Sequence, residues 1–170
     1  LLASQKVTSP EEGRKLLLET INNGAAYDKL KAFVEAQGGD SSYVDHIELL
    51  PKATIIEEVA ATSSGYIESV ETEEVGLATM MLGGGRETKD SIIDFTVGFI
   101  IHKKVGDTIK EGESIATIHG NDRDKIEASK KRFLKAYKIT TSEVDRHKFI
   151  KGIVTKYGIK RVLRTHMGQV

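Results

Sequence analysis

Residues 82–89 have the composition of a loop that could hold a ligand. Three consecutive glycines free the backbone to adopt positive φ angles and to approach a ligand closely, and two cations after them offer donors to an anion. The candidate cleft-facing residues are Gly83, Gly84, Gly85, Arg86 and Lys89. One interpretation is a mobile flap that closes over an anionic or polar ligand, and the other is a helix terminator with exposed cations. The loop lacks the Gly-x-x-x-x-Gly-Lys-Ser/Thr pattern of phosphate loops and does not open a helix as a dinucleotide fingerprint would.

The histidines and acidic pairs do not have the spacing of a catalytic or metal site. No His-x-x-x-His or Glu-x-x-His pair falls on an expected helix, and no Gly-x-Ser-x-Gly elbow is present. The pairs Glu57-Glu58 and Glu73-Glu74 are expected to be solvated charges or helix N-terminal charge rather than a general acid and base. The five histidines are His46, His102, His119, His147 and His166. We therefore predict no catalytic residue and no metal site in this sequence.

Two helices are predicted in the first fifty residues. Ser9, Pro10 and Glu12 have the capping-box arrangement, which predicts a helix over residues 10–22. A second helix is predicted over residues 25–37, where the apolar side chains are spaced so that they can face one partner. Those side chains are Tyr27, Leu30, Phe33 and Val34.

Beyond a linker at residues 41–51 the hydrophobic period changes to two. Thr72 is expected to cap a short helix, and residues 91–102 are rich in β-forming side chains. Further strands are predicted near residues 55–59, 65–70 and 114–118, a helix over residues 122–137, and a strand or short helix around Phe149, Ile150, Ile153 and Val154. Helices first and mixed strands and helices afterwards predict an α+β fold.

The charge of the chain is divided between two parts. The 25 basic and 25 acidic residues give a net charge of zero, but residues 146–170 hold seven basic residues and no acidic one. The body is therefore about −7, which disfavours a globally basic nucleic-acid binder and predicts no nucleic-acid partner, although a contact through the tail alone is an alternative. No apolar run reaches the roughly 18–20 residues of a membrane helix, so no membrane partner is predicted. The lack of cysteine and of a signal peptide favours a cytoplasmic location.

The segment from Lys104 to Ile115 resembles the Val-Gly-Asp-x-Val-x-x-Gly-Glu turn of biotinyl and lipoyl carrier domains, which have barrel-sandwich folds. Those domains carry their modified lysine in a Met-Lys-Met or Asp-Lys-Ala hairpin, and neither element occurs here. A non-catalytic carrier or adaptor module of this type is nevertheless the alternative function.

Several blocks, taken in order, resemble the C-terminal part of pyrimidine-nucleoside (thymidine) phosphorylases over roughly residues 8–140. They are Ala36-Gln37-Gly38-Gly39-Asp40, Gly65-Tyr66, Gly76-Leu77-Ala78, Met80-Met81-Leu82-Gly83-Gly84-Gly85-Arg86, Thr88-Lys89, Ile93-Asp94, Val97-Gly98 and the segment 103–118. The resemblance implies part of a two-domain enzyme that closes over a pyrimidine nucleoside and phosphate and forms pentose 1-phosphate and free base. Phosphate is then a co-substrate, and no cofactor is implied.

The resemblance also implies how the chain is divided. Residues 1–50 would be a helical segment and linker from the end of the helical domain, and residues 51–140 a C-terminal mixed α/β domain with a barrel-sandwich-like or hammerhead-like sheet and flanking helices. Residues 141–170 would be a basic tail packed on that domain. Because the sequence begins at Leu1 without Met or a cap, we expect a fragment of a longer chain.

The functional residues of the family are not found in this sequence. Its Lys-His-Ser-Thr-Gly-Gly phosphate block is absent, so no catalytic residue can be carried over and the fragment alone is predicted to be inactive. The family is usually dimeric through its helical domain, which implies a homodimeric parent. Within the family the glycine-rich loop lies near the interdomain cleft, so Gly83 to Arg86 match positions that help to close it. This chain has Gly84 where the family more often has alanine.

Overall fold

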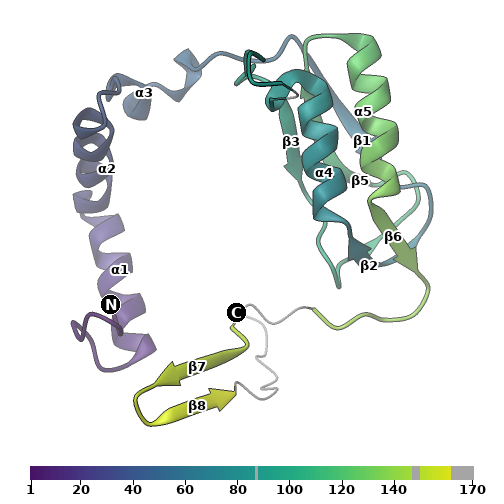
Figure 1. The fold of residues 1–170 in the computed structure, drawn as a ribbon. Helices are drawn as coiled ribbons and strands as arrows, with labels where there is room; N and C mark the ends of the chain where they lie inside the picture. Colours follow the sequence, from purple (N-terminus) through teal and green to yellow (C-terminus); the bar gives the residue numbers. More distant parts are fainter. Residues whose placement is uncertain (87, 147–149, 162–170) are drawn as a thin grey trace. The chain divides into compact units, whose positions relative to one another are not determined.

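A computed structural model describes residues 1–86, 88–146 and 150–161 (Figure 1). His147, Phe149, His166 and the end of the expected basic tail lie outside these residues. The chain divides into two compact units, Leu1–Pro51 and Lys52–Val170, and each is described by itself. None of the described helices is both long and apolar enough to cross a membrane.

The first unit begins with two helices, α1 (Pro10–Asn22) and α2 (Ala25–Ala36), as predicted. The capping box forms at the start of α1, where the Ser9 hydroxyl accepts a hydrogen bond from the Glu12 backbone N–H at 3.1 Å. The Glu12 carboxylate in turn accepts one from the Thr8 backbone N–H at 2.9 Å. Gly24, with φ of 83°, makes the turn into α2.

The segment expected to be a linker contains two short helices, α3 (Ser42–Asp45) and the 3₁₀ turn η1 (Ile47–Leu49). A side-chain cluster ties this segment to α2: the Tyr27 hydroxyl donates to the Val44 carbonyl and to Asp45, and Lys31 forms an ion pair with Asp45. The linker prediction overlooked these contacts because Tyr27 and Asp45 are far apart in the sequence.

Among its described residues, the second unit contains two three-stranded antiparallel sheets, a separate two-stranded hairpin and two α-helices. The sheets have the strand orders β1-β5-β3 and β4-β2-β6. Their strands are β1 (Ile55–Ala60), β2 (Gly65–Val70), β3 (Gly98–Ile101), β4 (Thr108–Ile109), β5 (Ser114–Gly120) and β6 (Tyr137–Thr140). The helices α4 (Thr72–Thr79) and α5 (Arg123–Lys135) lie side by side, and α5 packs against β1 and β5 of the first sheet (Figure 1). This arrangement confirms the predicted α+β fold.

The core of this unit lies between the sheets and α5. Ile67, Ile118 and Phe133 have no exposed surface, and the ring of Phe133 stacks on Phe99 with centroids 4.4 Å apart. The buried Ser129 hydroxyl donates to the Ala78 carbonyl at 2.6 Å, which fastens α5 to α4. The helical spacing that predicted α5 thus corresponds to its core-facing side.

Two local predictions in this unit are wrong. The β-rich run 91–102 forms a strand only over β3, because the Asp94 carboxylate accepts the Thr96 backbone N–H at 2.9 Å and holds residues 94–96 in a turn. Thr72 does not cap α4: it is the first helical residue, and Glu71 occupies the cap position without a side-chain hydrogen bond.

Past residue 150 the chain forms a hairpin of β7 (Gly152–Thr155) and β8 (Gly158–Arg161). The sequence left a strand or a short helix open here, and the strand is what forms. Ile153 and Val154 are both exposed.

Candidate functional site

The glycine-rich loop begins at the end of α4, where the helix widens into a π-helical turn, η2 (Met80–Gly84). Gly83 leaves the helical conformation with φ of 103° and ψ of 2°. A residue with a Cβ atom would be strained there, so glycine is required by the backbone. The Gly83 carbonyl accepts the Asp94 backbone N–H at 2.9 Å, which ties the start of the loop to its end.

Gly84 and Gly85 are required for packing. A Cβ atom on Gly84 would lie 3.0 Å from the Thr79 methyl group and 3.2 Å from the Thr79 carbonyl oxygen. One on Gly85 would lie 3.1 Å from Cγ of Met80. The glycines therefore let the loop fold back closely on the last turn of its own helix.

A network of side-chain hydrogen bonds holds the far end of the loop. The Asp94 carboxylate accepts the Thr96 hydroxyl at 2.6 Å and the Asn121 amide at 2.8 Å. The Asn121 carbonyl oxygen accepts both the backbone N–H and the hydroxyl of Thr54, at 2.8 and 3.1 Å. The hydrogen bonds that Asp94 accepts, first that from the Thr96 hydroxyl, hold the pKa of Asp94 below its usual value. The loop is thereby fixed to the residues flanking β1 and β5.

The two cations of the loop, Arg86 and Lys89, differ from its glycines in being exposed on the surface. Neither cation makes a hydrogen bond or an ion pair with a residue in the described part of the chain. Lys89 lies in a tight turn that Thr88 and Ser91 close, with the Thr88 backbone N–H donating to the Ser91 hydroxyl at 3.0 Å. The three predicted glycines therefore lie at the end of α4, and the two predicted cations are exposed on the surface of the same loop.

Two large apolar side chains that the sequence did not single out project from the same loop. Ile92 and Phe95 are 93% and 90% exposed. Both belong to the β-rich run 91–102. The signal that could have placed them is Asp94-x-Thr96, a pair that commonly forms a side-chain-stabilised turn.

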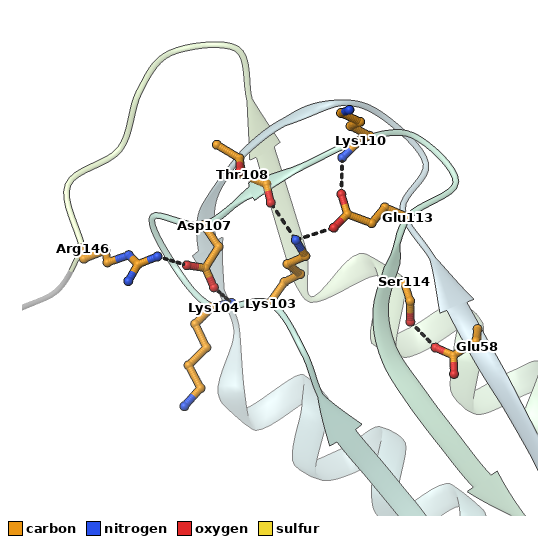
Figure 2. Close-up of polar contacts among 9 residues, drawn as sticks. All are labelled: Glu58, Lys103, Lys104, Asp107, Thr108, Lys110, Glu113, Ser114 and Arg146. Carbon is orange, nitrogen blue, oxygen red and sulfur yellow. Dashed lines mark hydrogen bonds and ion pairs between the residues drawn. The ribbon is translucent and has the colours of Figure 1, made fainter. Parts of the chain in front are cut away.

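The Val105-Gly106-Asp107 turn and the segment after it form a second polar cluster (Figure 2). Asp107 accepts the Lys104 backbone N–H at 2.9 Å and a hydrogen bond from the Arg146 guanidinium at 2.7 Å. Glu113 accepts the Lys110 backbone N–H at 2.9 Å and pairs with Lys103, and these contacts, led by that with Lys103, lower its pKa. Both carboxylates are thus engaged in holding turns, which is a structural role.

Of the described histidines, His102 and His119 both lie near Glu58 of the first sheet, whereas His46 belongs to the first unit. The Nε2 atom of His102 is hydrogen-bonded to the Thr117 hydroxyl at 2.8 Å. The Nδ1 atom of His46 lies 3.1 Å from a carboxylate oxygen of Glu48. The Nε2 atom of His119 is buried without a hydrogen-bond partner among the described residues. Within residues 1–86, 88–146 and 150–161, no group of three or more histidine, aspartate or glutamate side chains is arranged to hold a metal ion.

Comparison with known proteins gives the chain its relatives. Residues 66–140 match the family described as pyrimidine nucleoside phosphorylase C-terminal domain. A pyrimidine-nucleoside phosphorylase of Staphylococcus aureus (strain USA300) is 45% identical over 131 residues, and one of Staphylococcus haemolyticus (strain JCSC1435) is 48% identical over 131 residues. In each case the match covers 77% of this chain and 30% of the relative, so the chain spans about a third of the length of these proteins.

The family match contains most of the second unit described above, including the glycine-rich loop and the turn at Asp107. It also contains Asp94, Thr96 and Asn121 of the hydrogen-bond network, whereas Thr54 precedes it. The resemblance inferred from the sequence blocks is confirmed: residues 66–140 match the C-terminal domain of the pyrimidine-nucleoside phosphorylase family.

Proposed function

We propose that the chain is part of an enzyme that transfers the pentosyl group of a pyrimidine nucleoside to phosphate. In this reaction the bond from the anomeric carbon to the base nitrogen breaks and a bond from that carbon to a phosphate oxygen forms. The base leaves with the bonding electrons and takes up a proton. The observation that carries the proposal is the 45% and 48% identity to two pyrimidine-nucleoside phosphorylases over 131 residues.

Within that enzyme, residues 83–89 serve closure and positioning rather than bond chemistry. Phosphorolysis requires phosphate held in line with the anomeric carbon and water excluded, because water would compete as a nucleophile. A loop whose ends are held in place and whose two cations are exposed suits this role. Asp94 and Asn121 hold its base, and Arg86 and Lys89 carry positive charge toward an anionic co-substrate. The reaction needs no cofactor.

The remaining features of the proposal concern the whole enzyme. The sequence has no Lys-His-Ser-Thr-Gly-Gly block, so the chain alone is inactive and the chemical groups come from another part of the enzyme. That enzyme is a cytoplasmic homodimer joined through its helical domain, and it has neither a nucleic-acid nor a membrane partner. The helical unit 1–51 belongs to the end of the helical domain.

A chimera tests the activity. The segment of the Staphylococcus aureus phosphorylase that matches this chain is replaced by this chain, and release of free base from thymidine and uridine is measured with and without phosphate. We expect phosphate-dependent release by the chimera and none by the chain alone. A folded chimera without activity would contradict the proposal, and a mass increment on a lysine after coexpression with biotin or lipoate ligase would support the carrier alternative.

The same chimera tests the loop. Arg86→Ala removes one charge-assisted contact, which is expected to lower kcat/KM about tenfold. The matched control is Lys131→Ala, which removes an exposed cation on α5, away from the loop. Unchanged kcat and KM in Arg86→Ala would refute the role of the loop in closure while leaving the activity itself untouched.

A further inference from the structure

A cavity of about 650 Å³ opens at the end of the second unit that holds the Asp107 turn. None of the residues that line it belongs to the glycine-rich loop. Its volume lies within the roughly 300–1,000 Å³ range of small-molecule sites. It is therefore large enough for an organic ligand and separate from the site discussed above.

One part of the cavity wall is apolar. Val70, Val75, Ile101 and the ring of Tyr137 contribute to it. The Tyr137 hydroxyl is already used, since it donates to the Lys103 carbonyl at 3.2 Å, and burial raises the pKa of Tyr137 to about 12. This part of the wall therefore offers neutral, apolar contact surface to a ligand.

The other part of the wall is charged, and its charges are unequally satisfied. Lys103, Lys104 and Arg146 line the cavity, against one carboxylate, Asp107. Arg146 pairs with Asp107, and Lys103 pairs with Glu113, which is not among the lining residues. Among the described residues, the Lys104 ammonium has neither a hydrogen bond nor an ion pair, and its side chain extends away from these pairs in Figure 2.

These pairings leave the cavity with a net positive character. The carboxylate of Asp107 is compensated by Arg146 and by the Lys104 backbone N–H, so it does not cancel the Lys104 charge. An ammonium beside apolar surface is complementary to a molecule that is apolar over most of its body and anionic at one end.

We propose that this cavity binds a small organic anion, with its flat apolar body against Tyr137 and its carboxylate or phosphate monoester group against the Lys104 ammonium. Neutral molecules of the same shape bind more weakly, because they leave the ammonium unpaired. Inorganic phosphate binds more weakly too, because it leaves the apolar wall uncovered. Binding here does not require phosphorolysis.

The test is a titration of the full chain with four probes, measured by calorimetry. The probes are naphthalene-1-carboxylate, 1-naphthyl phosphate, the neutral naphthalene-1-carboxamide and inorganic phosphate. We expect saturable binding of at least one naphthyl anion and about tenfold weaker binding of the carboxamide. The two anions distinguish a carboxylate from a phosphate ligand.

Variants locate the site. Lys104→Gln is expected to weaken binding of the anion about tenfold, and Lys104→Arg to retain most of it, because the charge remains. Lys131→Gln, which alters an exposed cation on α5 outside the cavity, is the control and should not change the affinity. Lys104 is exposed, so its variants are expected to fold, and thermal unfolding confirms this. The proposal is overturned if no naphthyl anion binds saturably, if the carboxamide binds as tightly, or if Lys104→Gln and Lys131→Gln have equal effects.

Discussion

Replacement of Asn121 by alanine should loosen the base of the glycine-rich loop. The amide of Asn121 makes four hydrogen bonds, two as donor to Asp94 and Thr96 and two as acceptor from Thr54. Each such bond contributes about 0.5–1.5 kcal/mol net, and water can replace part of this at an exposed residue. We therefore expect Asn121→Ala to lower the free energy of unfolding by about 2 kcal/mol, or roughly 6–10 °C in Tm for a unit of this size.

The assay is thermal unfolding followed by circular dichroism, combined with hydrogen exchange at single amides. Exchange should accelerate most at Thr54 and Thr96, because both lose a partner or a neighbour in the network. Asn22→Ala is the matched control, since Asn22 is an exposed asparagine on α1 that makes no side-chain hydrogen bond within the described part of the chain. If Asn121→Ala were as stable as Asn22→Ala and its exchange unchanged, the network would not be what holds the loop.

Two further substitutions probe the same region. Gly84→Ala should destabilise the chain by about 1 kcal/mol despite its gain in helix propensity, because the new methyl group meets Thr79, whose hydroxyl is held at 3.0 Å by the Val75 carbonyl. Gly76→Ala is the control, because a Cβ atom at Gly76 meets nothing within 4 Å. Chemical denaturation of this variant should show a gain in the free energy of unfolding of about 0.5–1 kcal/mol. A stabilised Gly84→Ala would contradict the prediction, because it would mean that the Thr79 side chain moves to make room for the methyl group. Asp94→Asn should reduce the acid sensitivity of unfolding. Folding lowers the pKa of Asp94 from 3.8, so the ionised carboxylate stabilises the fold fully above pH 3.8, and this stabilisation is lost as the pH falls through the pKa of the folded state. If the free energy of unfolding of Asp94→Asn had the same slope against pH in this acidic range as that of the unaltered chain, the prediction would be contradicted.

The parts of the fold that the sequence predicted are those determined by neighbouring residues. The capping box of α1 lies within four residues, and the apolar stripe of α5 within a few turns, so both were visible in the sequence. The run 91–102 is rich in β-forming side chains but forms a strand only at β3, because the hydrogen bonds of Asp94 hold the residues before it in a turn. The content of β-forming residues alone does not indicate the turn at residues 94–96.

The candidate site was predicted only in part for a related reason. The glycines and cations of residues 83–89 are adjacent in the sequence, so the sequence alone groups them as a candidate site. Asn121 and Thr54 are 67 residues apart and have no distinctive motif, so their joint role in holding the loop follows only from the pairing of β1 with β5. The cavity at Lys104 could not be predicted from the sequence for the same reason, because Tyr137 and Arg146 reach it from distant parts of the chain.

The two units hold their structure by different means, and this bears on where the loop gets its shape. In the first unit the helices expose large apolar side chains, with Ile21 and Phe33 each 62% exposed, and caps and the Asp45 cluster supply much of the order. The second unit buries a continuous apolar core, from Val59 through Phe133. Every residue that fixes the base of the glycine-rich loop, from Thr54 to Asn121, belongs to the second unit. The shape of the loop therefore depends on the core of the second unit, and a change confined to α1 or α2 should leave it intact.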